Sequence, residues 1–413
     1  MTDQGIKIAV IGAGISGLGA AYLLHRQNDV TVFEKNAYTG GHSRTLEVEG
    51  IPVDTGFIVY NEPNYPLLSV LFRHLGVATQ KSEMSFGASI ADGFLEYSSK
   101  APFAQRKNIL RPAYLRMVAD ILRFNCMAER YIDMPDITLG ECLDRLGMGE
   151  WFRRYYILAM GAAIWSCSAT TMLAFPAGTF LRFFKNHGLL TVSNQPQWYT
   201  VTGGSQAYVR KLTAGFADKI RLNTAARSVL RTEDDIVVTD VGGQKHAFDR
   251  VIFASHADEA LRLLENPTAQ EKSILGAFSY QDNEAVLHSD ASLMPKNKSC
   301  WASWIYLSET KISDAPSVSL TYWMNNLQNL PAETPLFVTL NPGRAPQAGL
   351  VHDRHKFSHP VFNCAAVTAQ SRLTDIQGKN RSHFCGAWTR YGFHEDGLMS
   401  GVAVAKDLGA SWI

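Results

Sequence analysis

The residues near the start of the chain whose types and spacing could bind a nucleotide are three glycines and an acid. Gly12, Gly14 and Gly17 follow an apolar run, and Glu34 stands about 20 residues beyond them. In such a pattern the first glycine allows a tight turn, the second lets the backbone approach a pyrophosphate, and the third lets a helix lie close to a sheet. A carboxylate at position 34 can accept hydrogen bonds from ribose hydroxyls and argues against a 2′-phosphate. The pattern predicts a dinucleotide with a free 2′-hydroxyl.

The surrounding residues predict the elements that such a site needs. Residues 6–11 are apolar except for Lys7 and indicate a buried parallel strand. Small apolar residues at helical spacing follow the glycines, and a β-branched run at 30–33 indicates the next strand. The helix would begin at the glycines, where unpaired N–H groups and the helix dipole favour an anion. A glycine-rich turn in an ordinary α/β domain is the alternative.

Length and composition limit the number of domains and the class of partner that the chain can have. The chain has 413 residues, enough for two or three domains, with 46% apolar residues, 19% charged residues and a net charge of +1, so nothing indicates nucleic acid as a partner. Six cysteines without a CxxC pair predict neither a metal site nor a disulfide framework. Residues 1–7 lack a basic segment before a leader-like core, so we expect no cleaved secretory signal and a cytoplasmic location.

A second glycine pair follows the nucleotide strand. Gly40 and Gly41 precede His42 and Arg44. A simple NAD domain does not need this pair, which would let the backbone pass close to a larger cofactor, with Arg44 near its phosphate or flavin. A plain hairpin turn is the alternative interpretation.

These motifs together resemble the flavin amine oxidase superfamily, which includes protoporphyrinogen oxidases, carotenoid desaturases and monoamine oxidases. The resemblance rests on the glycine unit, on Gly-Gly-His-Ser-Arg-Thr at 40–45 and on Asp-Thr-Gly-Phe at 54–57. The family's usual arginine directly after the glycine pair is His42 here, so either His42 or Arg44 would contact the cofactor. The resemblance implies an α/β fold: a Rossmann-type, glutathione-reductase-like FAD-binding domain with a second, amine-oxidase-like α+β substrate domain.

The passage at 383–405 extends the resemblance to the other end of the chain. A short strand is expected to end at Gly386, and Gly397 opens a helix of small residues. In the resembled family the first glycine lies against the flavin ribityl and pyrophosphate groups, and the helix start points N–H groups at the pyrimidine edge. A helix N-terminus there would stabilise the negative charge of a reduced flavin.

The resemblance implies non-covalent FAD and a set of residues that hold it. Ala226 matches the position whose backbone contacts adenine, although the residue there is usually larger. The predicted FAD-binding residues are Gly12, Gly14, Ile15, Ser16, Gly17, Glu34, Lys35, Gly41, His42, Arg44, Thr55, Gly56, Phe57, Ala226, Ala254, Gly386, Ala387, His394, Asp396, Gly397 and Leu398.

Two histidines are the candidate catalytic residues. Amine oxidases hold the substrate amine between two aromatic rings. In the resemblance one of these positions is His394, and the other falls near His359. A neutral imidazole can donate, accept or shuttle a proton near neutral pH. Each histidine could instead be a hydrogen-bonded structural residue. A lysine that contacts the flavin through water in amine oxidases is expected near 283 and 284, where this chain has Asn283 and Glu284.

The substrate prediction rests on a further likeness. Several pieces of the chain are similar to a less characterised bacterial branch of the superfamily, known as predicted NAD/FAD-binding proteins, and similar modules are fused to cyclopropane-fatty-acid synthases. The resemblance implies a desaturase, oxidase or isomerase acting by hydride transfer on a fatty acyl or phospholipid-derived substrate. An amine or polyamine oxidase is one alternative, and a non-enzymatic flavoprotein partner of a lipid-modifying enzyme is another.

Two further segments have unusual composition. Residues 100–123 mix six basic side chains with apolar ones against one acid, Asp120, which suits either peripheral contact with the inner face of a membrane or a solvated helix packed on the core. Residues 155–181 carry no charge, but hydroxyl residues and Pro176 interrupt them. They predict two buried helical pieces around a bend, forming the wall of an apolar tunnel or plain core.

The predicted domains are discontinuous in sequence. Residues 1–80, 200–260 and 355–413 are expected to form the FAD-binding domain. Residues 81–199 and 261–354 are expected to form the substrate domain.

Overall fold

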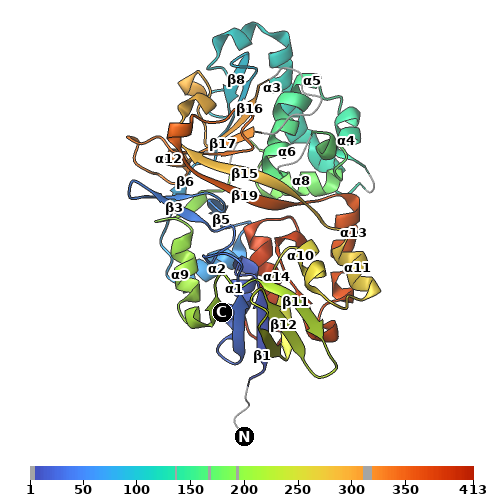
Figure 1. The fold of residues 1–413 in the computed structure, drawn as a ribbon. Helices are drawn as coiled ribbons and strands as arrows, with labels where there is room; N and C mark the ends of the chain where they lie inside the picture. Colours follow the sequence, from blue (N-terminus) through green and yellow to red (C-terminus); the bar gives the residue numbers. More distant parts are fainter. Residues whose placement is uncertain (1–4, 135–136, 166–168, 192–194, 310–318) are drawn as a thin grey trace.

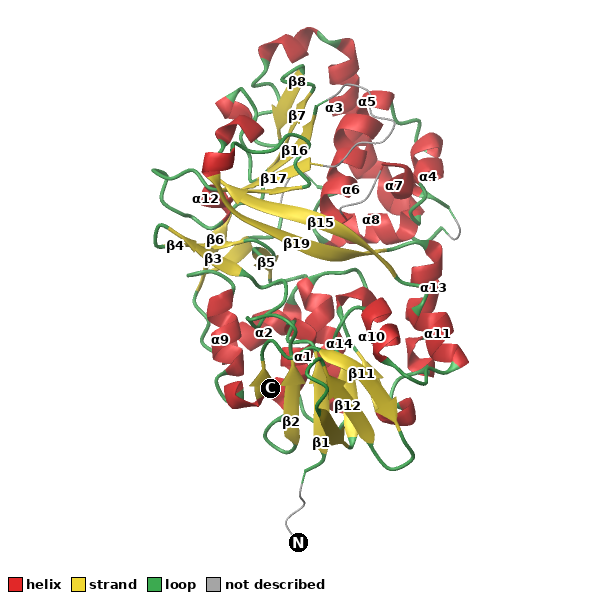
Figure 2. Cartoon of the chain, viewed as in Figure 1, coloured by secondary structure: helices red, strands yellow, loops and turns green. Residues whose placement is uncertain are grey.

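The structure, a computed structural model, describes residues 5–134, 137–165, 169–191, 195–309 and 319–413. The chain forms two halves stacked along the long axis of the molecule (Figure 1). The half that carries the N-terminus holds a parallel sheet flanked by helices, and the other half holds a long antiparallel strand pair with helices to one side (Figure 2).

The first half is built on a five-stranded sheet with the order β10-β2-β1-β14-β20. All four neighbouring pairs are parallel. The strands are β1 (Lys7–Ile11), β2 (Asp29–Phe33), β10 (Ile220–Arg221), β14 (Arg250–Phe253) and β20 (Ser382–Phe384). The central strand β1 is apolar on both faces because helices cover both sides of a parallel sheet, and Ile8, Ala9 and Val10 are fully buried. The predicted strand–helix–strand unit is present, and the α/β fold class is confirmed.

Helices α1 (Ile15–Leu24) and α14 (His394–Asp407) pack side by side against this sheet. Small residues allow the close approach: a Cβ at Gly401 would lie 2.1 Å from the Ser16 carbonyl oxygen, and one at Gly17 would lie 2.1 Å from that of Gly12. The first and last helices of the described chain are therefore neighbours, although about 370 residues separate them in the chain.

Smaller elements complete the first half and lead to the second. The helices are α2 (Pro66–His74), α9 (Gln206–Thr213), α10 (Ala257–Leu263), α11 (Ala269–Leu275) and α13 (Cys364–Ser371). A three-stranded antiparallel sheet contains β11 (Ala226–Arg231), β12 (Ile236–Asp240) and β13 (Lys245–Phe248). Two small sheets contain β3 (Thr45–Val48) with β4 (Ile51–Asp54), and β5 (Val59–Asn61) with β9 (Trp198–Val201) and β6 (Thr79–Ser82).

The second half contains a seven-stranded sheet with the order β19-β15-β18-β17-β16-β7-β8. Its strands are β7 (Phe86–Ile90), β8 (Leu95–Ser98), β15 (Ser279–His288), β16 (Trp304–Ser308), β17 (Ser319–Trp323), β18 (Phe337–Leu340) and β19 (Val351–Val361). The long pair β15 and β19 runs across the molecule next to the first half (Figure 2). The site described below therefore has the parallel sheet on one side and this pair on the other.

Helices cover one side of the second sheet. They are α3 (Pro112–Met127), α4 (Leu139–Arg145), α5 (Glu150–Phe152), α6 (Leu158–Trp165), α7 (Ala169–Leu173) and α8 (Ala177–Asn186), and α12 (Met324–Leu327) follows β17. The predicted bend in residues 155–181 is a series of three short helices, and Pro176 caps α8. Residues 166–168 of that segment lie outside the described residues. No helix within the described ranges is long and apolar enough to cross a membrane.

The predicted domain ranges can be compared with these sheets. Every strand of the five-stranded sheet lies within the ranges assigned to the FAD-binding domain. Residues 355–361, assigned to the same domain, belong to β19 and pair with β15 in the seven-stranded sheet. The domain division remains a prediction.

Candidate functional site

The first glycine loop forms a cradle at the carboxyl end of β1. Gly12 has a φ of +107°, a backbone conformation that residues other than glycine rarely adopt. Its N–H donates to the Phe33 carbonyl oxygen at 2.8 Å. A Cβ at Gly14 would meet no atom within 4 Å, so space lies in front of this loop. The loop ends at the N-terminus of α1, whose free N–H groups suit a phosphate. These features fit the pyrophosphate of a dinucleotide.

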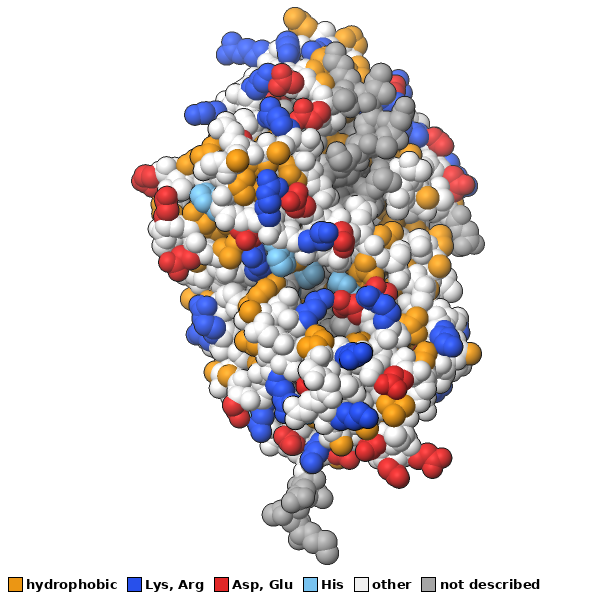
Figure 3. Space-filling view, viewed as in Figure 1, with side chains coloured by type: hydrophobic (Ala, Val, Ile, Leu, Met, Phe, Trp, Pro, Cys, Tyr) orange, Lys and Arg blue, Asp and Glu red, His pale blue; other side chains and the backbone are white. Residues whose placement is uncertain are grey.

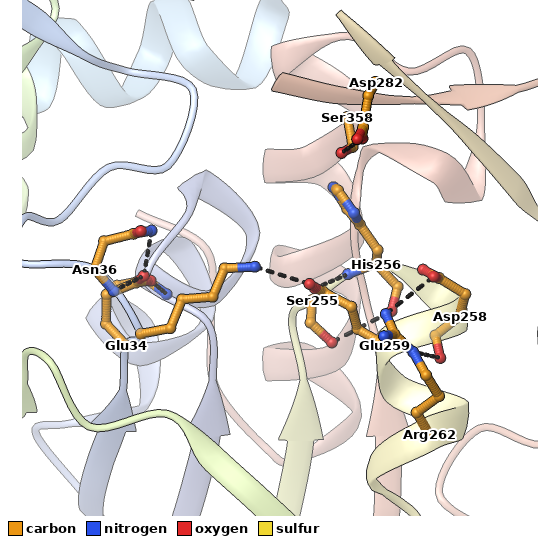
Figure 4. A network of polar contacts seen from close by, with 11 residues as sticks. Glu34, Asn36, Ser255, His256, Asp258, Glu259, Arg262, Asp282 and Ser358 are labelled. Atoms are coloured by element: carbon orange, nitrogen blue, oxygen red, sulfur yellow. Dashed lines mark hydrogen bonds and ion pairs between the residues drawn. The ribbon is translucent and has the colours of Figure 1, made fainter. Parts of the chain in front are cut away.

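Glu34 lies at the end of β2, where the sequence predicts a ribose contact. Its buried carboxylate accepts a hydrogen bond from the Ala13 N–H at 2.8 Å and another from the Asn36 N–H at 2.8 Å. These bonds fix the acid beside the glycine loop (Figure 4). The next residue, Lys35, is exposed and forms an ion pair with Glu259 at 2.8 Å.

The second glycine pair packs against the first loop. The Gly40 N–H donates to the Ala13 carbonyl oxygen at 2.7 Å, and a Cβ at Gly41 would lie 3.2 Å from the Gly14 Cα. The two glycine motifs found in the sequence are thus adjacent in space.

His42 and Arg44 have different surroundings, although the sequence left both as cofactor contacts. The Arg44 guanidinium forms an ion pair with Asp353 of β19 at 2.8 Å and donates to Thr55 at 3.2 Å. His42 stacks on Phe357, with ring centroids 4.7 Å apart, and its shielded Nε2 has no hydrogen-bond partner among the described residues. Burial holds the pKa of His42 well below its usual value, so the ring is neutral.

The C-terminal motif meets the N-terminal one at the start of α14. A Cβ at Gly397 would lie 2.9 Å from the Ile15 side chain and 3.0 Å from the Ser16 hydroxyl. The Phe393 N–H donates to Asp396 at 2.9 Å, and burial raises the pKa of this carboxyl to about 6. The N-termini of α1 and α14 therefore open at the same place, which fits a cofactor held from both ends of the chain.

His394, the first residue of α14, belongs to a hydrogen-bonded relay. Its Nε2 lies 2.6 Å from the Tyr208 hydroxyl, which lies 2.6 Å from the Ser43 hydroxyl. The ring stacks on Phe57, with centroids 4.0 Å apart. Burial lowers the pKa of His394 to about 3, so the imidazole is neutral near pH 7. A neutral ring in such a relay can take up or pass on a proton.

His359 on β19 is oriented by two asparagines. The Glu284 N–H donates to the Asn341 Oδ1 at 2.9 Å, so the Asn341 amide nitrogen donates to the Asn283 Oδ1 at 2.6 Å. The Asn283 amide nitrogen must then donate to the His359 Nδ1, which lies 2.8 Å away. His359 is therefore the tautomer with its proton on Nε2, and burial lowers its pKa to about 4.

The other predicted contacts are spread along the same edge. Ala254 follows β14, and its carbonyl oxygen would lie 2.8 Å from a Cβ at Gly12. Ala387 begins the turn after Gly386, whereas the Leu398 side chain is buried against α1. Ala226 begins β11. The Gly56 backbone approaches His42, since a Cβ there would lie 2.1 Å from the His42 carbonyl oxygen.

A histidine that the sequence analysis did not select also faces this region. His256 follows β14, and its side chain points from there toward Asp282 and Ser358 on the β15–β19 pair (Figure 4). Its ring stacks on Tyr280 at 4.2 Å, and burial lowers its pKa. Like Tyr208, Asn283 and Asn341, it comes from an element distant in the chain from the glycine motifs, so no spacing in the sequence indicates it.

A pocket of about 180 Å³ opens beside the loop that leads into α14. Its walls combine aromatic and aliphatic side chains with two threonines, one glutamine and one cation, Arg390, and none of the described residues that line it has a carboxylate: they are Phe175, Thr179, Phe362, Val367, Gln370, Thr389, Arg390 and Tyr391. The Arg390 side chain is 46% exposed and lies 3.8 Å from Asp396.

Aromatic side chains connect this region to the helices of the second half. Phe183 of α8 stacks on Phe393 at 4.8 Å and on His187 at 3.8 Å. His187 in turn lies 6.4 Å from Trp198. The pKa of His187 is lowered to about 4 by burial, so this row is uncharged. It provides an apolar surface directly before His394.

No group of three or more histidine, cysteine or acidic residues in the described part of the chain could hold a metal ion.

Comparison with known sequences finds a family model and a relative that match this chain. A family model described as flavin containing amine oxidoreductase matches residues 15–280. The protein AofH of Mycobacterium tuberculosis, named for a flavin-containing monoamine oxidase, is 28% identical over 258 residues, which cover 59% of this chain and 55% of AofH. The chain thus spans about half the length of that relative.

Two solved structures share the fold. A CLA-producing fatty acid isomerase from P. acnes is 15% identical, with a TM-score of 0.68 and coverage of 99% of this chain and 98% of that one. Cyclohexylamine oxidase from Brevibacterium oxydans IH-35A is 15% identical, with a TM-score of 0.70 and coverage of 98% and 99%. Because proteins named for a fatty acid and for an amine match equally well, the fold does not choose between these substrates.

Proposed function

The chain belongs to the family of flavin-containing amine oxidoreductases, and from this premise we propose that it is an FAD-dependent oxidoreductase acting on an apolar substrate with an acidic head group. The substrate class that we propose is a fatty acyl or phospholipid-derived chain. Family membership confirms the superfamily and the flavin cofactor predicted from the sequence.

One observation carries the substrate proposal. The pocket beside α14 mixes apolar side chains with hydroxyl and amide groups and has a single cation, Arg390, and the described residues that line it include no acid. Arg390 is 46% exposed, and the Asp396 carboxylate lies 3.8 Å from it, outside the lining. An arginine pairs well with a carboxylate or phosphate and repels an ammonium group. The neutral aromatic row before His394 adds a surface that suits an acyl chain rather than a cation.

The proposed cofactor contacts follow from the cradle. The open space at Gly14 and the N-termini of α1 and α14 would bind the pyrophosphate and the flavin, and Glu34 would bind the ribose. Of His42 and Arg44, we assign the contact to His42, because its buried Nε2 has no partner in the part of the chain that the structure describes, while Arg44 is held by Asp353. When bound, FAD supplies a hydride acceptor.

The two candidate catalytic histidines would have different roles. His359 can only donate from Nε2, because Asn283 occupies its Nδ1. It is therefore suited to orient a polar group of the substrate or cofactor. His394 is linked through Tyr208 to Ser43, so it is suited to move a proton at the site.

Amine oxidation is the second candidate. The 28% identity to AofH favours it. Two observations count against it. Arg390 in the pocket would repel an ammonium group, and Asn283 stands near the position where amine oxidases have a lysine that contacts the flavin through water.

Anaerobic mixing of the FAD-loaded protein with candidate substrates tests the proposal. We expect oleate, linoleate or phosphatidylglycerol to bleach the flavin absorbance or to yield a product with a moved or new double bond, seen by gas chromatography. We expect putrescine and cyclohexylamine to do neither. Bleaching by an amine and no reaction of any acyl lipid would overturn the substrate proposal. The absence of every reaction would favour a non-enzymatic flavoprotein.

A matched pair of arginine variants sharpens the test. Arg390→Gln should raise KM for an acidic acyl substrate about tenfold, because a charge-assisted contact is lost. Arg354→Gln removes a half-exposed arginine on β19 that pairs with Glu284, away from the pocket lining, and should leave KM unchanged. Equal effects of the two variants would exclude Arg390 from substrate binding.

A further inference from the structure

Exposed apolar side chains gather at the end of the molecule opposite the N-terminus. Eleven large hydrophobic residues are exposed in the described chain, and five of them fall within residues 103–122. Leu110 is the most exposed of all, at 86%, and Ile109 beside it is 50% exposed. Figure 3 shows hydrophobic and basic side chains together at this end, which Figure 1 assigns to α3 and β8.

The local structure holds these side chains outward. Ile109 and Leu110 end a short 3-10 helix, Arg106–Leu110, directly before α3. Between them and the sheet, the buried Asn108 amide donates to the Glu96 carbonyl oxygen at 3.2 Å, and Arg111 donates to the Phe94 carbonyl oxygen at 2.8 Å. The turn is thus fixed by polar contacts to β8 and to Phe94, the residue that precedes β8. Leu110 stays almost fully in solvent, and Ile109 is half exposed.

Cations surround this tip. Arg106 and Lys107 are exposed within the same turn, and Arg116 and Arg123 follow on α3 with side chains 67% and 43% exposed. The one acid of residues 100–123, Asp120, is 4% exposed and pairs with both of these α3 arginines. The surface therefore presents positive charge around an apolar centre.

We propose that this tip, residues 103–111 with the exposed face of α3, docks on an anionic phospholipid bilayer. Ile109 and Leu110 would insert among the acyl chains, and Arg106 and Lys107 would lie at the head groups, as in proteins that combine apolar insertion with a basic rim. A second copy of the chain fits the surface poorly, because the same patch on both copies would bring like charges together. The proposal does not depend on the proposed substrate.

The two faces of α3 bear on the two sequence interpretations of residues 100–123. The inner face of α3 belongs to the core, with Tyr114, Met117 and Phe124 almost completely buried. The outer face carries Leu115 and Leu122, both exposed. The membrane contact that we propose is therefore centred on the turn before the helix rather than on the whole segment.

Sedimentation with lipid vesicles tests the proposal on the FAD-loaded full chain. We expect binding to vesicles of phosphatidylcholine with phosphatidylglycerol, little binding to phosphatidylcholine alone, and loss of binding as salt rises. The double variant I109S/L110S should weaken binding about tenfold or more. R106Q/K107Q should weaken it by about fivefold for each cation removed.

A matched control uses another exposed apolar residue with a nearby lysine. Val241 is 58% exposed and Lys245 follows it on the three-stranded sheet of the first half, so V241S/K245Q should bind vesicles as the parent does. Flavin absorbance and thermal unfolding confirm that each variant is folded. A tryptophan introduced by L110W should be quenched by brominated acyl chains, and one introduced by V241W should not.

Three outcomes would overturn the proposal. They are failure of the parent to bind anionic vesicles, equal binding by I109S/L110S, and a concentration-dependent dimer that I109S/L110S abolishes while vesicles are ignored. The last outcome would assign the tip to contact between copies of the chain.

Discussion

At the carboxyl edge of the parallel sheet, where we propose that the cofactor binds (the cofactor edge), the glycine-rich segments are held by main-chain contacts. On β15 and β19 (the opposite side), the polar groups are held by side-chain hydrogen bonds. The cofactor edge depends on close backbone contact, such as that of Gly401 with Ser16. The opposite side depends on the sequence of donors and acceptors through Asn341 and Asn283 to His359. The first arrangement should be sensitive to added volume, and the second to the loss of a single polar atom.

Replacing His394 should have the largest effect on turnover. His394→Phe keeps the ring stack on Phe57 but removes the proton relay through Tyr208, so we expect kcat to fall about 100-fold with FAD still bound. Flavin absorbance and steady-state kinetics measure the two properties separately.

The matched control is His288, another buried neutral histidine, which bonds to Thr339 away from the site. His288→Gln should leave kcat within a factor of two or so. Unchanged turnover in His394→Phe would exclude His394 from proton transfer.

Added volume at the cofactor edge should have the next largest effect. Gly401→Ala places a Cβ against the Ser16 backbone and should lower the free energy of unfolding by about 1–3 kcal/mol and reduce FAD content, because α14 must move away from α1. Gly349→Ala is the control, since a Cβ there meets no atom within 4 Å. Denaturant unfolding and flavin absorbance provide the measurements. Equal stability of the two variants would show that the helix contact is not tight.

Loss of the Asn283 side-chain amide should impair the function of His359 without weakening FAD binding. Asn283→Leu releases His359 from its fixed tautomer, and we expect kcat/KM to fall about tenfold with FAD content unchanged. Gln281→Leu, an exposed change two residues earlier on β15, should have no effect. Asn283→Asp should raise the pKa of His359 and move the acid limb of the pH profile upward. A pH profile identical to that of the parent would contradict the role of Asn283.

The smallest effect concerns acid stability. The pKa values of His359 and His394 are lowered to about 4 and about 3, below the 6.5 of an unfolded histidine. The unfolded chain therefore binds protons that the folded chain does not, and the free energy of unfolding should fall as pH drops from about 6.5 to about 4. Urea unfolding across this range should show a shallower fall in His359→Phe. The effect should be modest because both rings keep some contact with solvent.

The strand–helix–strand backbone at the cofactor edge could be predicted from the sequence, because the residues that indicate it lie close together in the chain. Gly12, Gly14 and Glu34 belong to one strand–helix–strand unit. The second motif, with Gly386 and Gly397, likewise lies where a strand leads into a helix. Gly12 adopts a positive φ, and Gly397 lies too close to Ile15 for a Cβ, so these two positions require glycine. The spacing of the glycines within one local unit therefore indicates the backbone conformation without knowledge of distant contacts.

The opposite side could not be predicted in the same way. The bond between Asn283 and His359 joins residues 76 positions apart, and at the cofactor edge the bond between Tyr208 and His394 joins residues 186 positions apart. Asn283 and His359 meet only because β15 and β19 are neighbours in one register, which no local pattern determines. The choice between His42 and Arg44 likewise depended on Asp353, 309 residues from Arg44.

The sheet places β1, β14 and β20 in that order, and this order has a consequence for synthesis of the protein. The sheet that begins with residues 7–11 is complete only when residues 382–384 have been made, and α14 follows still later. A ribosome-bound chain therefore exposes the apolar face of α1 through most of translation, and such exposed surfaces promote aggregation. Cofactor loading can be completed only after α14 has left the ribosome, so FAD supply and chaperone capacity should together limit the yield of folded protein.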